Sequence, residues 1–301
     1  MSHKTIKKIR HTLTYSVARG FIAFVNVIPR SLAVFLGAWV GLTLWAVLPR
    51  ERHRALRHLS LVYRQSLSDA EKRGIARRFF INSGKNLADV ARFQKHYETE
   101  LRQLVEVDGL EHFDRAYRAG KGMFGVTGHI GNFELLAVHM AGMGYDIAVI
   151  GREMYDTRLD RMLVGNREAL GLTNISTEES PKRLISWLRE GKAVGVLMDT
   201  DSIRVRSMFV PAFGRLSNTP VGQTLLGLRV GAAFLPMACI RVPGDRYRII
   251  VKPPIEYQLT GDDERDVYEV TRRCTRALEE IIDRYRDQWI WIHNRWHTRP
   301  E

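Results

Sequence analysis

The sequence predicts an α/β fold in which helices flank a mainly parallel sheet, preceded by a hydrophobic helical segment that associates with a membrane. Short apolar runs alternate with segments of helical periodicity from about residue 104 onwards, which is typical of parallel strands joined by helices. Residues 31–49 carry no charge and lie close to the N-terminus. A strand-like run at residues 122–126 opens through glycines into a helix-like run, and open α/β sheets bind ligands at such junctions.

Residues 1–64 carry most of the positive charge of the chain. Eleven Lys and Arg side chains oppose a single acidic one, Glu51, so this region holds +10 of the formal net charge of +13. The excess flanks residues 31–49, which would form a helix of roughly 28 Å, about the thickness of a bilayer's hydrocarbon layer. Basic flanks around an apolar stretch are typical of membrane proteins, whereas a nucleic-acid groove would charge the folded domain. We therefore expect a membrane partner and no nucleic acid.

The apolar N-terminal residues are compatible with several arrangements. Residues 20–48 can dip into the membrane and return with Pro29 at the bend, or residues 31–49 can span it once. Both flanks are basic, so the charges fix no topology. A secretory signal is disfavoured because Arg30 interrupts the apolar stretch and no small residues mark a cleavage site. A buried helix of a soluble protein is the remaining alternative.

The chain divides by pattern into two parts. We expect a basic and hydrophobic membrane-associating segment at residues 1–50 and one domain at residues 51–301, helical over 51–103 and α/β over 104–301. Ser-Asp-Ala-Glu at residues 68–71 is typical of a helix start. The aromatic and apolar positions of this helical part share one face, which either packs in the core or contacts lipid. They are Phe79, Phe80, Leu87, Val90 and Phe93.

Strands and helices alternate over the remainder of the chain. Apolar runs predict strands at residues 105–107, 122–126, 147–150, 193–198, 233–240 and 247–251. Helical periodicity predicts helices at residues 132–143, 157–170, 181–190 and 219–230, and a long charged helix at 262–287. Gly244 and Asp245 separate the last two strands, which predicts an antiparallel hairpin at one edge of the sheet.

A glycine-rich turn at residues 128–134 joins a predicted strand to a predicted helix and reads Gly-His-Ile-Gly-Asn-Phe-Glu. Gly128 and Gly131 permit backbone angles that other residues resist. Asn132 is then a natural N-cap for the helix. The local sequence therefore predicts a tight strand-turn-helix junction.

His129 and Glu134 are the reactive pair of this turn. They are five residues apart and would point about 140° apart on one helix, so they meet only if His129 lies before it. In that geometry the Glu134 carboxylate binds one ring nitrogen of His129, and the other nitrogen can take a proton from a substrate hydroxyl. The alternative is a structural turn in which the histidine only packs.

Two arginines are expected near the same edge of the sheet. Arg152 follows the strand at residues 147–150, and Arg167 closes the next helix. A guanidinium group there can bind a phosphate or stabilise developing negative charge. The alternative for each is a solvated surface charge.

Asp199 and Asp201 follow the strand at residues 193–198, again at the functional edge of a parallel sheet. Two carboxylates without a defined third ligand are weak evidence for a metal. We expect neither metal nor cofactor, and expect these carboxylates to orient an arginine or a substrate hydroxyl.

Residues 202–217 are expected to form a loop that mixes arginines with apolar side chains. Arg204, Arg206 and Arg215 suit an amphiphile with an anionic headgroup, and Arg215 is a candidate for substrate contact. Asn-Thr-Pro at residues 218–220 predicts a helix start, and a helix N-terminus is a potential anion site.

The C-terminal residues and the cysteines are less specific. Residues 289–296 are aromatic and basic, which suits either a membrane interface or packing onto the domain. Cys239 and Cys274 have neither metal-type spacing nor a disulfide framework, so we expect buried, reduced thiols.

The motif resembles a known family. His129 and Glu134 match the H-x4-D/E motif of the glycerolipid and lysophospholipid acyltransferase superfamily, and residues 128–134 most resemble its bacterial lipid A branch, the late (secondary) acyltransferases. Further blocks match in order. They are residues 152–156 (Arg-Glu-Met-Tyr-Asp), Leu159, Asp160, Arg167, Asp199, Asp201, residues 210–214 (Val-Pro-Ala-Phe-Gly), Thr219, Pro220, and residues 291–296, which resemble the closing W-x-H-x-R pattern.

There are also departures from the family pattern. Thr200 stands where members often have Gln, and Ala212 where they often have Phe, which bears on the acyl chain and the acceptor more than on the chemistry. The E-G-T-R block of phosphatidic-acid-forming relatives is absent, which favours the lipid A branch.

The resemblance implies a glycerolipid acyltransferase-like fold over residues 51–301 and an enzyme of the inner (cytoplasmic) membrane whose active site faces the cytoplasm. The donor would be an acyl carrier protein thioester, or acyl-CoA. The acceptor would be a hydroxyl of a lipid A precursor, with a lysophospholipid or another lipid as the alternative. A non-catalytic protein that binds anionic lipid is a third possibility.

Residue roles follow by similarity. His129 would be the general base and Glu134 its partner. Arg152 and Arg167 would contact phosphate or the transition state, and Asp199 and Asp201 would be structural or orient the substrate. Since no activated serine or cysteine accompanies the motif, direct attack on a bound acyl donor is simpler than a covalent intermediate.

Overall fold

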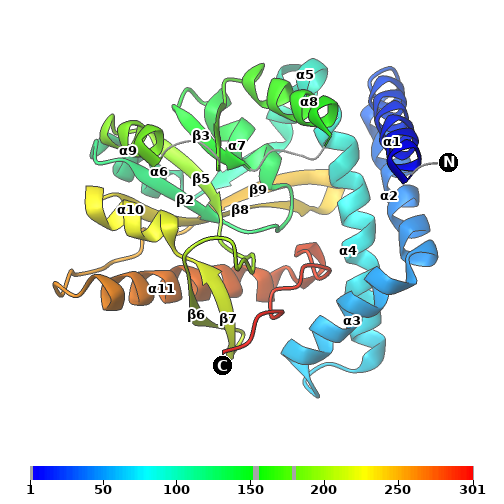
Figure 1. Ribbon diagram of the computed structural model, residues 1–301. Coiled ribbons are helices and arrows are strands. Elements are labelled where there is room, and N and C mark those ends of the chain that lie inside the picture. Colours follow the sequence, from blue (N-terminus) through cyan, green and yellow to red (C-terminus); the bar gives the residue numbers. More distant parts are fainter. Residues whose placement is uncertain (1–2, 152–155, 178–180, 301) are drawn as a thin grey trace.

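The computed structural model describes residues 3–151, 156–177 and 181–300, and a seven-stranded sheet forms the centre of these described residues (Figure 1). Its strands run in the order β1-β9-β8-β2-β5-β3-β4. They are β1 (Val105–Asp108), β2 (Met123–Thr127), β3 (Ile147–Gly151), β4 (Thr173–Ser176), β5 (Ala193–Leu197), β8 (Ala233–Val242) and β9 (Arg246–Val251). Among these strands, only β8 and β9 pair antiparallel. The predicted α/β fold with a mainly parallel sheet is confirmed.

One edge of the sheet differs from the prediction. The hairpin of β8 and β9 is present, but β1 pairs with β9 in parallel and so takes the edge position. At the other edge lies β4, which the sequence did not predict, because Thr-Asn-Ile-Ser lacks an apolar run. Apolar periodicity therefore located the buried strands and missed a polar edge strand.

Helices cover both faces of the sheet. They are α5 (Phe93–His96), α6 (Leu110–Arg118), α7 (Phe133–Gly142), α8 (Thr157–Glu168), α9 (Pro181–Arg189), α10 (Gly222–Val230) and α11 (Asp263–Arg284). Side chains of α6 and α7, such as Phe113 and Leu135, join Met123 in the core of one face. Those of α9, α10 and α11 join Phe124 in the core of the other. Neighbouring residues of β2 thus enter opposite cores, as the two-residue period of a strand requires.

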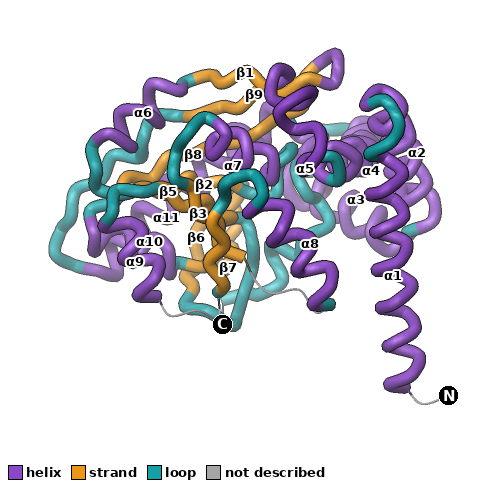
Figure 2. Tube along the Cα trace, turned by 90° about the horizontal axis from the view of Figure 1, so that it is seen from above, coloured by secondary structure: helices purple, strands orange, loops and turns teal. Residues whose placement is uncertain are grey.

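Four further helices form a layer beside the sheet. They are α1 (His3–Val25), α2 (Arg30–Val47), α3 (Pro49–Tyr63) and α4 (Asp69–Val90). Figure 1 shows α2 running alongside α4, whereas Figure 2 shows α1 projecting crosswise from them. A Cβ atom on Gly41 would lie 2.1 Å from the carbonyl oxygen of Phe80, so α2 and α4 approach at the distance that only glycine allows.

The start of α4 is as predicted, because Ser68 and Glu71 form a capping box. Its apolar face, which the sequence left open between core and lipid, lies only partly in the core. Phe79 and Phe80 are buried, but Leu87 is exposed over half of its surface.

The outer face of α2 is apolar and exposed. Phe35 is 56% exposed and Trp39 is 52% exposed. Within the described part of the chain, α2 is the one helix with the length and composition to cross a membrane. α2 is therefore not a fully buried helix. Pro29 precedes α2 at the turn from α1.

A separate hairpin lies where a loop was predicted. β6 (Ser207–Ala212) and β7 (Arg215–Pro220) pair antiparallel, and Phe213 and Gly214 turn between them with positive φ. The predicted helix start at residues 218–220 is wrong, since Asn218 lies inside β7 and α10 begins at Gly222. The Asn218 amide donates instead to Asp201 Oδ1 (3.2 Å) and the Ser202 carbonyl (3.0 Å), contacts that local sequence does not reveal.

Candidate active site

The turn between β2 and α7 carries the Gly-His-Ile-Gly-Asn-Phe-Glu motif of residues 128–134. Asn132 is the N-cap of α7, as predicted, because its side-chain oxygen accepts a hydrogen bond from the Leu135 N–H (3.1 Å). Its side-chain nitrogen donates to the Tyr247 hydroxyl (3.2 Å), and the residue is 2% exposed. Both ends of this buried amide thus have protein partners, and the substrate contact of Asn132 stays a prediction.

Both glycines of the turn are needed for close approach. Gly131 has φ +58°, and a Cβ atom there would lie 1.9 Å from the carbonyl oxygen of Cys239. A Cβ atom on Gly128 would lie 2.8 Å from Asp199 Oδ2. The carbonyl of Gly131 also accepts a hydrogen bond from the Asn86 amide of α4 (2.9 Å). The turn is therefore fixed against β8, the end of β5 and the helical layer.

His129 is paired with Asp199. Its Nδ1 lies 2.8 Å from Asp199 Oδ1, and its backbone N–H donates to Asp199 Oδ2 (2.7 Å). The pairing follows from the sheet, because β2 and β5 run parallel in the register Thr127–Leu197 and end side by side. The indole N–H of Trp289 donates to the same carboxylate (2.8 Å). This corrects the prediction that Glu134 binds the ring of His129.

The charge of Asp199 defines the state of the pair. Burial alone raises the pKa of this carboxyl, but the adjacent His129 and the hydrogen bonds from His129 and Trp289 outweigh burial and hold the pKa well below its usual range. An ionised carboxylate only accepts hydrogen bonds, so the Nδ1 of His129 carries a proton. The Nε2 of His129 is then the ring nitrogen that accepts a proton.

Glu134 is paired with Arg167. The Nε of Arg167 donates to Oε2 (2.9 Å) and its Nη2 to Oε1 (2.5 Å), while Nη1 donates to Asn174 Oδ1 (3.2 Å). The side chains of Glu134 and Arg167 are 15% and 14% exposed. Such a two-pronged ion pair between α7 and α8 is both strong and directional. Glu134 and Arg167 thus neutralise each other between the two helices.

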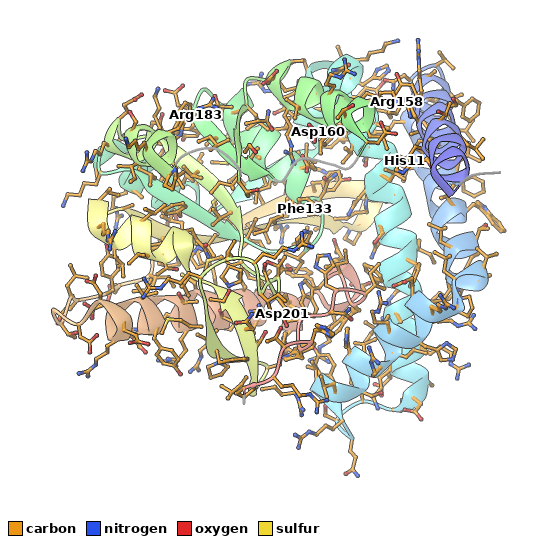
Figure 3. The ribbon with its side chains drawn as sticks, viewed as in Figure 1. His11, Phe133, Arg158, Asp160, Arg183 and Asp201 are labelled. Carbon is orange, nitrogen blue, oxygen red and sulfur yellow. The ribbon has the colours of Figure 1, made fainter. Side chains whose placement is uncertain are left out.

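An apolar cavity opens next to this pair. It has a volume of about 60 Å³ and lies between α7 and the strands β2, β3 and β5. Gly125 and Gly195 leave space along the strands, and Met237 lines the same cavity. Phe133, Glu134 and Arg167 are among its lining residues, and the Phe133 ring lies 5.2 Å from that of His129, centroid to centroid. Figure 3 labels Phe133 near the middle of the molecule.

This geometry places an oriented histidine near an apolar cavity. A family model described as bacterial lipid A biosynthesis acyltransferase matches residues 2–298. The chain belongs to this family. It is an acyltransferase with an α/β fold.

Three relatives illustrate the range of this similarity. The chain is 26% identical over 283 residues to the lipid A biosynthesis palmitoleoyltransferase of Escherichia coli (strain K12), covering 91% of this chain and 87% of the relative. It is 25% identical over 294 residues to the lipid A biosynthesis lauroyltransferase of the same strain, covering 97% and 94%. It is 29% identical over 200 residues to a phosphatidylinositol mannoside acyltransferase of Mycobacterium tuberculosis (strain CDC 1551 / Oshkosh), covering 65% and 61%.

The other predicted site residues of this acyltransferase are dispersed. Asp201 accepts from the Asn218 amide and from the backbone N–H (2.7 Å) and hydroxyl (2.8 Å) of Thr298, so it anchors the C-terminal residues. Arg215 begins β7, pairs in register with Ala212, and has no contact with His129 among the described residues. Arg152 lies outside the described residues.

The C-terminal segment supplies contacts to His129 that the sequence did not predict. Trp289 and Trp291 are buried, which decides for packing over a membrane interface at these positions. The backbone N–H of Ile290 donates to the His129 carbonyl (3.0 Å), and Arg295 donates to the Thr200 carbonyl (2.7 Å). The signal available in the sequence was the W-x-H-x-R resemblance, but nothing in the spacing connects it with His129.

The cysteines of the acyltransferase are both free and buried, as predicted, and burial raises the pKa of each thiol. Neither is therefore suited to act as a nucleophile. Across residues 3–151, 156–177 and 181–300, no cluster of three or more His, Cys, Asp or Glu side chains could hold a metal ion.

Proposed function

We propose that this acyltransferase moves a fatty acyl chain from an acyl carrier protein thioester to a hydroxyl of a lipid A precursor, with His129 as general base. The observation that carries the proposal is the His129–Asp199 pair, whose histidine ring contacts Phe133, a residue that lines the apolar cavity. A base, its orienting carboxylate and a site for a hydrocarbon chain are the parts that direct acyl transfer requires.

The proposed reaction is a direct displacement. His129 Nε2 takes the proton of the acceptor hydroxyl as its oxygen bonds to the thioester carbonyl carbon, and the carbonyl oxygen becomes negatively charged. The carbonyl then re-forms, the carbon–sulfur bond breaks, and the leaving thiolate takes the proton from His129. Asp199 holds the Nδ1 proton throughout and stabilises the transient imidazolium.

The cavity is proposed to hold the acyl chain. Its lining of glycines and apolar side chains matches a hydrocarbon, and each buried methylene contributes about 0.8 kcal/mol. Arg167 uses three hydrogen bonds on Glu134 and Asn174, so we assign this pair to the shape and neutrality of the cavity mouth. Arg152 and Arg215 remain the candidates for contacts with an anionic acceptor.

The enzyme is proposed to work at the cytoplasmic face of the inner membrane. The exposed apolar face of α2 and the basic residues around it support attachment to an anionic bilayer. A thioester carried by acyl carrier protein would be supplied from that side.

A second acceptor class has its own support. The mycobacterial relative is a phosphatidylinositol mannoside acyltransferase, which favours another phosphorylated glycolipid over a simple lysophospholipid if the lipid A precursor fails. A non-catalytic lipid-binding role is disfavoured, because it would not need the His129–Asp199 pair.

The test measures acyl transfer by membranes that contain this chain. Acyl carrier protein thioester is the donor, and a tetra-acylated lipid A precursor, a mannosylated phosphatidylinositol and a lysophospholipid are offered separately. His129→Ala should lower transfer by about 10²–10⁴-fold. His53→Ala, which changes an exposed histidine of α3, serves as the matched control and should leave the rate unchanged.

Each result has a distinct meaning. Product on the lipid A precursor that requires His129 would support the proposal. Product on another acceptor alone would keep the base and overturn the acceptor. Transfer that is unchanged in His129→Ala would contradict the catalytic assignment.

A further inference from the structure

A second histidine lies against the catalytic base. The centroid of the His293 ring is 4.3 Å from that of His129, and the two ring planes meet at 70°. The contact is built by the C-terminal segment, in which the Ile290 N–H donates to the His129 carbonyl (3.0 Å). The ring of His129 therefore contacts both the ring of Phe133 and the ring of His293.

The backbone that carries His293 is firmly held. Arg295, which is 2% exposed, donates to the Thr200 carbonyl (2.7 Å) and to the Thr219 hydroxyl (2.9 Å). Trp291 is completely buried, and its carbonyl binds the ring of His58 (2.7 Å). A ring fixed between such anchors has little freedom to leave the site.

The ring nitrogens of His293 are open to a ligand, because His293 is only partly buried. No side chain or backbone group of the described residues forms a hydrogen bond with either nitrogen. By contrast, the rings of His58 and His139, which are buried, each bind a protein partner at Nδ1. The donor and the acceptor of the His293 ring are therefore available to a substrate.

The ring is also uncharged. Burial, helped by the neighbouring His129, lowers the pKa of His293 to about 4. At neutral pH the ring therefore offers one N–H donor and one acceptor and does not exchange protons with the reactants. A neutral imidazole is a suitable electrophile for a carbonyl oxygen.

We propose that His293 is a second catalytic residue, whose neutral ring donates a hydrogen bond to the carbonyl oxygen of the thioester while His129 takes the proton of the acceptor hydroxyl. The proposal rests on the proposed function, since it assigns His293 to the same reaction. Negative charge develops on that oxygen as the new carbon–oxygen bond forms. It disperses when the carbon–sulfur bond breaks, and His293 keeps its proton throughout.

The distance between the rings fits this role. When the acceptor hydroxyl oxygen lies about 3 Å from His129 Nε2, the thioester carbonyl that it attacks lies within reach of the neighbouring His293 ring. Removing one donor to a developing oxyanion typically costs about 10²–10³-fold in kcat. A ring that only packed against His129 would not need a nitrogen.

The experiment compares three side chains at this position. His293→Phe keeps a flat ring against His129 but has no donor, whereas His293→Gln keeps an N–H donor without the ring. His293→Met has nearly the size of Gln and no donor, so the last two form a pair matched in shape. Asn294→Ala, at an exposed neighbour, is the control.

Release of free thiol from the acyl thioester is measured with lipid acceptor and with water alone, together with Tm. We expect His293→Phe and His293→Met to lower kcat about 10²–10³-fold with little change in KM, and His293→Gln to recover at least about tenfold of that loss. The shape of the pH–rate profile above pH 5 should stay that of the wild type, because His293 does not titrate there.

The outcomes separate this inference from the proposed function. Equal rates for His293→Gln and His293→Met, or full activity in His293→Phe, would overturn the donor role and leave packing only. If the wild type transfers to no lipid offered, the acceptor assignment fails, and the slow transfer to water still decides the role of His293. Absence of any thiol release that depends on His129 would overturn both.

Discussion

Two pairs of charged or polar side chains lie at the same edge of the sheet and differ in what they leave free. In the pair of His129 and Asp199, the carboxylate is saturated by three hydrogen bonds, and one ring nitrogen remains available. In the pair of Glu134 and Arg167, both carboxylate oxygens bind the guanidinium group. Under the proposed function the first pair moves a proton, whereas the second is a fixed ion pair.

Proximity in sequence therefore pointed to the wrong carboxylate as the partner of His129. Glu134 lies five residues from His129, yet the carboxylate that binds the ring comes from a strand end 70 residues later. Glu134 and Arg167 line the apolar cavity, whereas His129 contacts that lining through the Phe133 ring, 5.2 Å away between centroids. Substitutions in one pair that leave the other pair intact test whether the two pairs have different roles.

The largest effect is expected at Asp199. Asp199→Asn keeps the size of the side chain but no longer fixes the proton on Nδ1, so kcat should fall by about 10³–10⁴-fold. Steady-state rates of thiol release in the variant and the wild type check this. A loss of less than about tenfold would show that the ring is oriented without this carboxylate.

The next effect is on stability, at the second pair. Arg167→Met should lower the free energy of unfolding by about 3 kcal/mol, because Glu134 is left as a mostly buried charge without its partner. Replacing Glu134 by Gln in the same chain should restore much of that loss. Denaturant unfolding of the single and double variants measures both values, and additive losses would contradict the pairing.

The sequence predicted the elements around these pairs well and the pairs themselves poorly. β2, β5 and α7 were located because each has an apolar run or period bounded by glycines or an N-cap. The hairpin of β6 and β7 was missed, since Asn, Thr and Pro at its end are typical of a helix start. Contacts such as His129 with Asp199, or with His293, depend on strand register and on the folded C-terminal segment, which spacing does not encode.

A third effect should separate the cavity from the base. Gly125→Val places side-chain atoms towards Met237 and reduces the space in the cavity. Acyl chains that no longer fit should lose about fourfold in kcat/KM for each excluded methylene, while short chains react normally. Competition between donors of different chain length measures this, with Gly165→Ala, which meets open space, as the control. An equal loss for all chain lengths would place the acyl chain elsewhere.

The smallest effect concerns a histidine with no carboxylate partner. His139 lies on α7, and burial lowers its pKa to about 4 from an ordinary 6.5. Between pH 6.5 and about 4, the unfolded chain binds a proton at this histidine that the folded chain does not bind. The stability of the fold therefore rises with pH over this range. His139→Gln should remove about 1–2 kcal/mol of this pH dependence. Unfolding at pH 4.5 and 7 tests this, and the exposed His297→Gln should change nothing.

The central claim is that Asp199, not Glu134, sets the tautomer of His129. The most direct test is the nitrogen NMR spectrum of histidine-labelled protein near pH 8, with His129 assigned by its loss in His129→Ala. The account predicts a protonated Nδ1 and an unprotonated Nε2 in the wild type and in Glu134→Gln, and loss of this preference in Asp199→Asn. A tautomer that follows Glu134 and ignores Asp199 would contradict it.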